Sequence, residues 1–403
     1  MVSTSAKTKR AYRYRFYPTQ EQAGQLARTF GCGRFVYNWG LATRKHAYFH
    51  EGKSLSYNDL AAMLPALKEE YPFLSEVSAV PLQQALRHLE RAFVNFFEGR
   101  ADYPVFKKKR NDQSATYAAN AFTWDGSTLT LAKMEAPLDI RWHRPLPKDT
   151  KPSSVTVSRD GAGRYFISIL VQEEIAKLAI TPKTVGLDLG LTSFVVTSDG
   201  EGIPNPKYYR QNERKLAKAQ QRHARKKKGS KNREKARKKV ARLHARIADC
   251  RRDYQHQRST RLMHENQVVC VESLAVKNMV KNPHLSKSIS DVGWGEFTRQ
   301  LGYKAAWYGR FLVKIDRFFP STKRCSACGY VLEELDLSVR EWVCPNCGVT
   351  HQRDHNAAKN VWAEGLSVLA ACGGSVRHGE VRASHAAPGE AGTSAREGRS
   401  PAL

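Results

Sequence analysis

Three acidic residues, far apart in the sequence, each stand at the end of an apolar run or at the start of a helix. Asp188 lies within Val185-Gly-Leu-Asp-Leu-Gly190, a predicted strand of a hairpin that ends at the turn Asp199-Gly200, and Glu272 ends the β-branched run that begins at Val268. Asp354 begins a predicted helix, where the helix dipole favours an acid. A carboxylate is costly to bury unless a cation pairs with it. The pattern predicts a cation site that only the fold can assemble.

The chemistry that suits these acids is metal-assisted phosphodiester hydrolysis. Two Mg²⁺ ions about 4 Å apart can activate a water and neutralise the leaving oxygen, and Mg²⁺ prefers carboxylate oxygens. In this interpretation Asp188 bridges both ions, and Glu272 and Asp354 each complete one. Two simpler interpretations remain: Asp188 is a turn-forming residue, or the three are unrelated surface acids. The basic helices described below favour the nuclease site.

Four of the eight cysteines form two pairs, Cys325-x-x-Cys328 and Cys344-x-x-Cys347, with fifteen residues between them. This spacing is typical of a four-thiolate zinc ribbon. Because four protein ligands close the coordination of one zinc ion, its predicted role is structural, and His351 is interpreted as a bystander. The alternative, that these are spare core cysteines, leaves the paired spacing unexplained. Metal-binding cysteines also indicate a reducing compartment.

The chain is strongly basic, with a formal net charge of +28 over 403 residues, which predicts a polyanion as partner. Residues 207–261 carry 22 Lys and Arg against four Asp and Glu, in two predicted helices joined by a turn at 226–230. A helix that is merely solvated normally mixes charge signs, so this excess predicts a phosphate-facing surface. The predicted nucleic-acid contacts are Lys226, Lys227 and Lys228, with Lys107, Lys108, Lys109 and Arg110 in a second exposed segment.

Periodicity divides the chain into several parts. Residues 7–17 alternate as a strand, a helical period runs from a capping box at Thr19 and Gln22 to about residue 100, and a two-residue period returns between 127 and 173. The first strand is predicted to pair with these later strands in a small β-barrel. Residues 311–319 are predicted to form a strand, and 373–403 to be disordered. No apolar run approaches the roughly 20 residues of a membrane span and no signal peptide is present, so we expect a cytoplasmic protein.

Several motifs together resemble TnpB, the transposon-encoded relative of type V CRISPR effectors, and the resemblance is most specific between Thr184 and Asn360. The motifs are Gly186-Leu-Asp-Leu-Gly190, Val271-Glu272-Ser-Leu, the four cysteines, Ser288-Ile-Ser-Asp-Val-Gly-Trp-Gly-Glu-Phe297, Tyr303-Lys-Ala-Ala-Trp-Tyr-Gly-Arg310 and Arg353-Asp354-x-Asn-Ala-Ala-x-Asn360.

The resemblance implies a multidomain α/β protein. Residues 181–320 and 350–372 would form a RuvC-like nuclease domain of RNase H fold, interrupted by a zinc ribbon at 321–349. Residues 1–18 and 101–180 would form a wedge-type β-barrel domain carrying a helical recognition insert at 19–100.

The resemblance also implies an activity. The family uses a guide RNA from the transposon end and cuts double-stranded DNA beside a short transposon-adjacent motif, and by carry-over Asp188, Glu272 and Asp354 are the catalytic residues. Candidates for reading the motif are Tyr57, Gln83, Tyr117 and Asn120. We expect one protein chain per guide RNA, acting at the nucleoid of a prokaryotic cell.

Two other functions remain open at the level of sequence. A non-cleaving RNA-guided DNA-binding regulator would be expected to lack one of the three acids, and all three are present. A transposase or guide-free nuclease is disfavoured because no catalytic Tyr or His-x-His arrangement is found.

Overall fold

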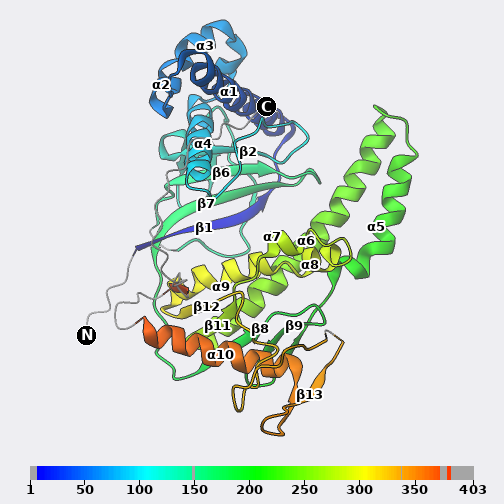
Figure 1. Ribbon diagram of the computed structural model, residues 1–403. Coiled ribbons are helices and arrows are strands. Elements are labelled where there is room, and N and C mark those ends of the chain that lie inside the picture. Colours follow the sequence, from blue (N-terminus) through cyan, green and yellow to red (C-terminus); the bar gives the residue numbers. More distant parts are fainter. Residues whose placement is uncertain (1–6, 148–149, 337, 373–378, 383–403) are drawn as a thin grey trace. The chain divides into compact units, whose positions relative to one another are not determined.

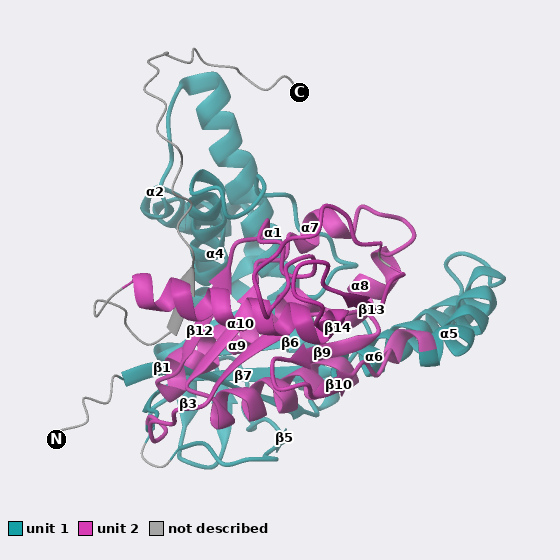
Figure 2. Ribbon diagram, turned by 60° about the horizontal axis from the view of Figure 1, so that its bottom comes forward, with its two compact units in different colours: residues 1–176, 211–249 teal, residues 177–210, 250–403 magenta. Residues whose placement is uncertain are grey.

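The computed structural model describes residues 7–147, 150–336, 338–372 and 379–382. The chain divides into two compact units, residues 1–176 with 211–249 and residues 177–210 with 250–403, which Figure 2 colours separately. The long helices α5 (Tyr208–Ala224) and α6 (Lys231–Glu265) each contribute residues to both units. The two units are described in turn.

The first unit contains a five-stranded antiparallel sheet in the order β2-β6-β7-β1-β5. These strands are β1 (Lys7–Phe16), β2 (Gln113–Ala118), β5 (Ile140–Arg141), β6 (Ser154–Arg159) and β7 (Tyr165–Glu174), and a hairpin of β3 (Phe122–Trp124) and β4 (Leu129–Leu131) stands beside them. The predicted pairing of the first strand with the later hairpin is confirmed, since β1 pairs with β7 along its whole length. Among the described strands β2 and β5 are edges, so the hydrogen bonds of this sheet do not close into a ring.

The predicted helical segment is also confirmed in the first unit. It contains α1 (Gln20–Glu51), α2 (Tyr57–Ala62), α3 (Leu64–Glu70), the short 3-10 helix η1 (Pro72–Glu76) and α4 (Ala79–Phe97). Thr19 and Gln22 form the predicted capping box at the start of α1. Along α4, Leu82, Leu86 and Leu89 recur at helical spacing and are buried, whereas Phe97, the last residue of the helix, is 77% exposed.

The second unit is built on a six-stranded mixed sheet in the order β10-β9-β8-β11-β12-β15. Its strands are β8 (Thr184–Asp188), β9 (Ser193–Thr197), β10 (Gly202–Pro204), β11 (Val268–Glu272), β12 (Phe311–Ile315) and β15 (Gly379–Arg382). The first three strands along the chain are antiparallel, and β11, β12 and β15 then extend the sheet in parallel from β8.

Alternate residues of β11 face opposite layers of helices. Val269 and Val271 pack in a core with α9 (Trp294–Tyr308) and α6, and Val268 and Cys270 pack in another with α10 (Arg353–Ala371). Figure 1 shows the sheet between α9 and α10. Residues 268–271 of β11 are all apolar because helices cover both faces of the strand.

Two sequence predictions need correction in this unit. The strand predicted at 311–319 ends at Ile315, because Asp316 turns the chain by accepting a hydrogen bond from the backbone N–H of Phe318 at 2.7 Å. Within the tail predicted to be disordered, Gly379–Arg382 form β15 beside β12; residues 373–378 and 383–403 lie outside the described part of the chain. The smaller elements are α7 (Val276–Met279), α8 (Ser286–Val292), and the hairpin of β13 (Glu341–Val343) and β14 (Thr350–Gln352). No described helix has the length and apolar character to cross a bilayer.

Candidate functional site

Asp188 and Glu272 end two neighbouring parallel strands of the second unit. Strands β8 and β11 pair in register up to Leu187 and Val271, and the two acids are the next residues along. Leu187 and Val271 face α9, so the alternation of the strands turns Asp188 and Glu272 toward the opposite face, which α10 covers. The fold therefore brings two of the three predicted acids to one edge and one face of the sheet.

Helix α10 can lie close to this face because the strands and the helix offer small residues where they cross. A Cβ atom on Gly186 of β8 would stand 2.3 Å from the carbonyl oxygen of Ala358, and one on Gly365 would stand 2.3 Å from Sγ of Cys270. Neither position can carry a side chain without moving the helix. Asp354 lies in the first turn of α10, and this close packing places that turn beside the end of β8.

The electrostatics of the three carboxylates show that they interact. Burial, followed by the negative charges of Glu272 and Asp354, raises the pKa of Asp188 to about 8, and the nearby Arg353 opposes that rise. Burial also raises the pKa of Glu272, whose carboxylate accepts a hydrogen bond from the Ser321 hydroxyl. A carboxylate whose pKa is raised by burial and by neighbouring negative charges is stabilised in its ionised form by a cation beside it.

Asp354 is held by two arginines. Its Oδ1 accepts a hydrogen bond from Nε of Arg353 at 3.1 Å, and its Oδ2 lies 3.8 Å from a guanidinium nitrogen of Arg340. The ligand atoms of the three carboxylates are not all within 4.8 Å of one another. Among the described residues, the four cysteines are the group of potential metal ligands that meets this distance. A wider arrangement suits Mg²⁺, which keeps several water ligands.

Sequence patterns missed the polar residues that tie this site to the neighbouring loop. Besides the Ser321 contact to Glu272, the side-chain amide of Asn360 donates to the carbonyls of Ser321 at 2.8 Å and Arg324 at 2.6 Å. Asn356 donates to the Arg324 carbonyl at 2.7 Å and accepts from the backbone N–H of Ser326 at 2.9 Å. Their presence in the Asn-Ala-Ala-x-Asn motif was a signal, but the motif does not reveal their partners.

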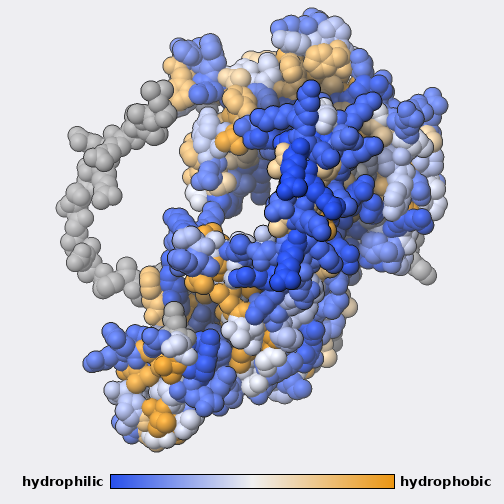
Figure 3. Space-filling view, turned by 90° about the vertical axis from the view of Figure 1, so that its right-hand side faces the viewer, coloured by the Kyte–Doolittle hydropathy of each residue, from blue (hydrophilic) through white to orange (hydrophobic). Residues whose placement is uncertain are grey.

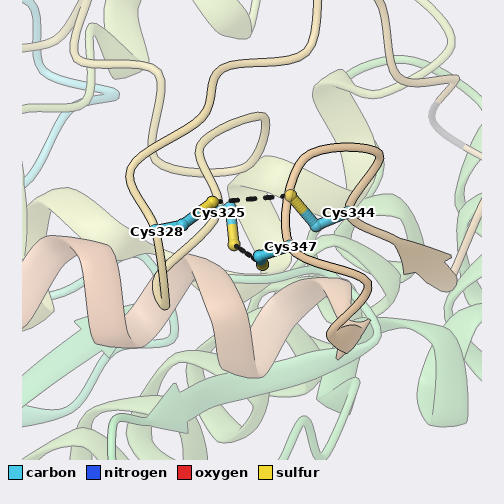
Figure 4. A group of neighbouring side chains, drawn as sticks. All are labelled: Cys325, Cys328, Cys344 and Cys347. Atoms are coloured by element: carbon cyan, nitrogen blue, oxygen red, sulfur yellow. Dashed lines mark hydrogen bonds between the residues drawn. The ribbon is translucent and has the colours of Figure 1, made fainter.

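The four cysteines converge from two loops, with their sulfur atoms turned toward one another in Figure 4. Sγ of Cys325 lies 3.7 Å from that of Cys347, and Sγ of Cys328 lies 3.6 Å from that of Cys344. These distances are far too long for disulfides of about 2.05 Å. Two zinc–sulfur bonds of about 2.3 Å at a tetrahedral angle separate the sulfurs by about 3.8 Å. The cluster therefore fits one structural zinc ion.

His351 is closer to this cluster than the sequence suggested. Its Nε2 lies 3.0 Å from Sγ of Cys325, and its ring packs on Trp342 with centroids 4.7 Å apart. Burial lowers its pKa, which favours the neutral ring. With four sulfurs already gathered, His351 stands as a hydrogen-bond neighbour of Cys325.

A cationic hollow follows the hairpin of α5 and α6, within the part that belongs to the first unit. The hollow has a volume of about 610 Å³ and is lined by Lys215, Lys218, Ala219, Arg222, Arg225, Lys226, Ala236, Lys239 and Leu243. Lys226, Lys227 and Lys228 in the turn are exposed. The hairpin faces the viewer in Figure 3 as a nearly continuous hydrophilic surface. The predicted turn and both helices are thus present.

The second predicted basic segment, Lys107–Arg110, is also exposed in the first unit. Although Lys107 is exposed as a whole residue, its ammonium group lies 4.0 Å from the centre of the Tyr37 ring, and the local burial of that group lowers its pKa. Lys107 and Lys108 line a cavity of about 410 Å³ together with Arg34 and His88.

The four candidates for motif reading fall in different environments of the first unit. Gln83 and Asn120 are exposed, and the ring of half-buried Tyr57 packs under the Arg87 guanidinium, 4.6 Å from its centre. Tyr117 is only 1% exposed, in the core of the sheet. The prediction that Tyr117 contacts DNA is therefore not supported, because a strand residue at that parity points inward.

Known families match three segments of the chain. A family described as probable transposases (OrfB of IS605) matches residues 166–283, a Cas12f1-like TNB domain matches residues 294–361, and a helix-turn-helix domain matches residues 6–53. In the structure the last of these segments consists of β1 and the single long helix α1. The first two matches span the three acids and the cysteine cluster.

Two relatives resemble nearly the whole chain. A protein of Streptomyces pristinaespiralis, named as a candidate RNA-guided DNA endonuclease, is 54% identical over 374 residues, covering 92% of each chain. InsQ of Escherichia coli K12, named in the same way, is 32% identical over 392 residues, covering 93% of this chain and 96% of its own.

A solved structure shows the same overall fold. The protein in the cryo-EM structure of a Cas12f1–sgRNA–target DNA complex aligns with a TM-score of 0.55 at 15% identity, covering 85% of this chain and 83% of its own. At this identity the similarity concerns the fold.

Proposed function

The chain belongs to the TnpB family of transposon-encoded proteins, and from this premise we propose that it is an RNA-guided DNA endonuclease. One observation of the site carries the proposal. Asp188 and Glu272 end adjacent parallel strands under the helix whose first turn carries Asp354, and the charges of Glu272 and Asp354 add to the burial that raises the pKa of Asp188. A site for hydrolysing a phosphodiester bond needs such a group.

Each residue has a separate part in the proposed reaction. Asp188 would bridge two Mg²⁺ ions, and Glu272 and Asp354 would each hold one. The ions, when bound, would activate a water and neutralise the leaving oxygen. Ser321 fixes the Glu272 carboxylate through its hydroxyl, and Arg353 and Arg340 fix Asp354.

We propose that the mixed sheet with α9 and α10 is a RuvC-like nuclease domain of RNase H fold, at 181–320 and 350–372. The zinc ribbon would occupy 321–349 within it. The sheet of the first unit would be the wedge-type barrel domain, at 1–18 and 101–180, and its helices the recognition domain, at 19–100. Strand order, the cysteine cluster and the helical insert support this division.

The basic surfaces of the first unit would hold the nucleic acids. We propose that the α5–α6 hairpin with Lys226, Lys227 and Lys228, and the segment Lys107–Arg110, bind phosphates of a transposon-derived guide RNA or of the target duplex. Pairing with the guide would read the target, while Tyr57, Gln83 and Asn120 would read the flanking motif. One chain would act per guide, in the cytoplasm at the nucleoid.

The experiment begins with the RNA. The protein is co-expressed with the DNA that flanks its gene, and the RNA that co-purifies is sequenced. The complex is then offered Mg²⁺ and plasmids that carry a guide-matched target beside a randomised flank. Cleavage should need the match, the flank and Mg²⁺, and Asp188→Ala should keep the RNA and lose cleavage.

Each alternative function gives a different result. A non-cleaving regulator would bind the matched plasmid and leave it intact with wild-type Asp188 present. A guide-free nuclease would cut unmatched plasmid equally well. Either result would refute the proposed function.

A further inference from the structure

A cavity of about 450 Å³ lies beside Glu272 on the face of the second unit's sheet that α9 covers, a size within the roughly 300–1,000 Å³ typical of ligand sites. It lies at the carboxyl ends of β11 and β12, next to the first turn of α9. Its lining consists of Glu272, Ser273, Leu274, Ala275, Val276, Trp294, Gly295, Thr298, Arg299, Lys314 and Arg317. The proposed chemistry uses Glu272 from this set and no other member.

The lining of the cavity carries positive charges that would attract an anion. Lys314, Arg317 and Arg299 bring three cations to it, and Glu272 is the one acid among the described residues that line it. Arg299 is held in place by Glu296, which accepts from its Nε at 2.8 Å and from a terminal nitrogen at 2.7 Å. Because the alternation of β11 turns the Glu272 carboxylate toward the face that α10 covers, the charged side chains left to the cavity are cations.

The start of α9 adds backbone donors. The helix has 15 residues, Trp294–Tyr308, and its N-cap, Gly293, makes no side-chain capping bond to the first turn. Trp294 and Gly295, the first residues of the helix, line the cavity. The N-terminus of a helix presents N–H groups and a partial positive charge, which suit an anionic oxygen.

An unsatisfied donor points independently to a missing acceptor. Trp294 is 3% exposed, and its indole Nε1–H is buried with no hydrogen-bond partner among the described residues. A buried indole N–H normally finds an acceptor, because leaving it unpaired costs about 1–3 kcal/mol. A ligand oxygen in the cavity that Trp294 lines would satisfy it.

We propose that this cavity binds a backbone phosphate of the DNA strand being cut, next to the phosphate that undergoes hydrolysis. Lys314, Arg317 and the first turn of α9 contact its charged oxygens, and Trp294 donates to one of them. Leu274 and Val276 offer apolar surface to the attached sugar. The site deepens the proposed endonuclease function and rests on it, because it orients the strand against Glu272.

The test neutralises one DNA phosphate at a time. Guide-loaded protein is given Mg²⁺ and matched targets in which a single phosphate near the cut is replaced by an uncharged methylphosphonate, and single-turnover rates are measured. Wild-type protein should slow about tenfold at one position adjacent to the cut, as expected for loss of charge-assisted hydrogen bonds. The double variant Lys314→Ala/Arg317→Ala should be about tenfold slower on unmodified DNA and should not slow further at that position.

A second pair of variants guards against simple misfolding. Trp294→Phe keeps the ring and removes the N–H, and Trp307→Phe makes the same change on the same helix away from the cavity lining. Trp294→Phe should shrink the methylphosphonate penalty at the same single position, and Trp307→Phe should leave it at the wild-type value.

Two results would overturn the proposal. The penalties could be the same in both cavity variants as in wild type, or no position near the cut could be sensitive in wild type. In the second case, inhibition of wild type but not of the double variant by millimolar inorganic phosphate would assign the cavity to a free anion. Failure of wild type to cut any unmodified matched target would instead refute the endonuclease function itself, and the subsite with it.

Discussion

The cysteine cluster and the carboxylate site of the second unit are assembled in opposite ways. The cysteines come from two short loops, and their sulfurs already stand within 4.8 Å of one another. The carboxylates come from two strands and a helix that lie up to 166 residues apart in the chain, between Asp188 and Asp354. The cysteine cluster depends on the spacing of residues within two short segments, whereas the carboxylate site depends on sheet pairing and helix packing.

The two sites also differ in what they do to the free energy of folding. The sulfurs stand at the separation that a tetrahedral zinc ion needs, so zinc binding would stabilise the loops. Burial disfavours the charged forms of Asp188 and Glu272, and the charges of Glu272 and Asp354 disfavour that of Asp188 further. The zinc site therefore contributes to the stability of the fold, whereas the stability of the fold holds the carboxylates together.

The largest expected effect comes from breaking the cysteine cluster. Cys344→Ser should lose the zinc and unfold the loops around it, because a structural zinc ion contributes about 10 kcal/mol or more of binding free energy. Hydrogen exchange measured over residues 321–352 and zinc content would report the loss. Cys250→Ser, a cysteine of α6 outside both sites, should change neither. Intact protection of residues 321–352 in a zinc-free Cys344→Ser protein would show that zinc does not stabilise these loops.

The next largest effect separates catalysis from stability. Glu272→Gln keeps the shape of the side chain and should lower the cleavage rate roughly 10³-fold or more, as for other essential catalytic residues. The free energy of unfolding of the metal-free protein should stay equal or increase, because burial disfavours the carboxylate. Single-turnover cleavage and denaturant unfolding measure the two quantities. A large loss of stability with little loss of cleavage would mean that Glu272 serves the fold and not the reaction.

The difference in assembly explains what the sequence could predict. The zinc ligands followed from the spacing of four cysteines alone. Asp188 and Glu272 were found because a lone carboxylate at the end of an apolar strand is unusual, and their shared face could be verified only from the register of β8 and β11. The capping box that begins α1, and the two basic helices α5 and α6 on either side of the turn at 226–230, were also predicted correctly.

The remaining contacts depend on neighbours that the sequence does not name. The hydroxyl of Ser321 and the amide of Asn360 act through partners 49 and 39 residues away. Tyr117 was proposed as a DNA contact, but it is buried. The residues around it do not reveal that β2 turns its side chain into the core. Strand β15 has the sequence Gly379-Glu-Val-Arg382, which is too short for a periodic pattern to show, and its backbone pairs with the edge of β12.

A third prediction uses pH to measure how much the ionised form of Asp188 destabilises the folded protein. The pKa of Asp188 rises from its usual 3.8 to about 8 on folding, so the folded protein holds this proton more tightly. Its contribution to stability is complete below pH 3.8 and is lost as pH rises toward 8. Without metal, Asp188→Asn should therefore be more stable than wild type by on the order of 4 kcal/mol near pH 8, with the gap closing toward pH 4. Denaturant unfolding in chelator across this range measures the gap, and a gap independent of pH would contradict this destabilisation.

The smallest effect tests whether helix packing, and not local spacing, sets the carboxylate site. Gly186→Ala places a methyl group where the carbonyl oxygen of Ala358 would be 2.3 Å away, so α10 must shift. We expect a loss of about 1–3 kcal/mol in the free energy of unfolding and slower cleavage, because Asp354 moves with the helix. Gly24→Ala is the matched control: nothing lies within 4 Å of its Cβ, and alanine should stabilise α1 by up to about 1 kcal/mol. Zinc content should be normal in both variants, since the sulfurs depend on their own loops; zinc loss in Gly186→Ala alone would mean that the two sites share one packing constraint.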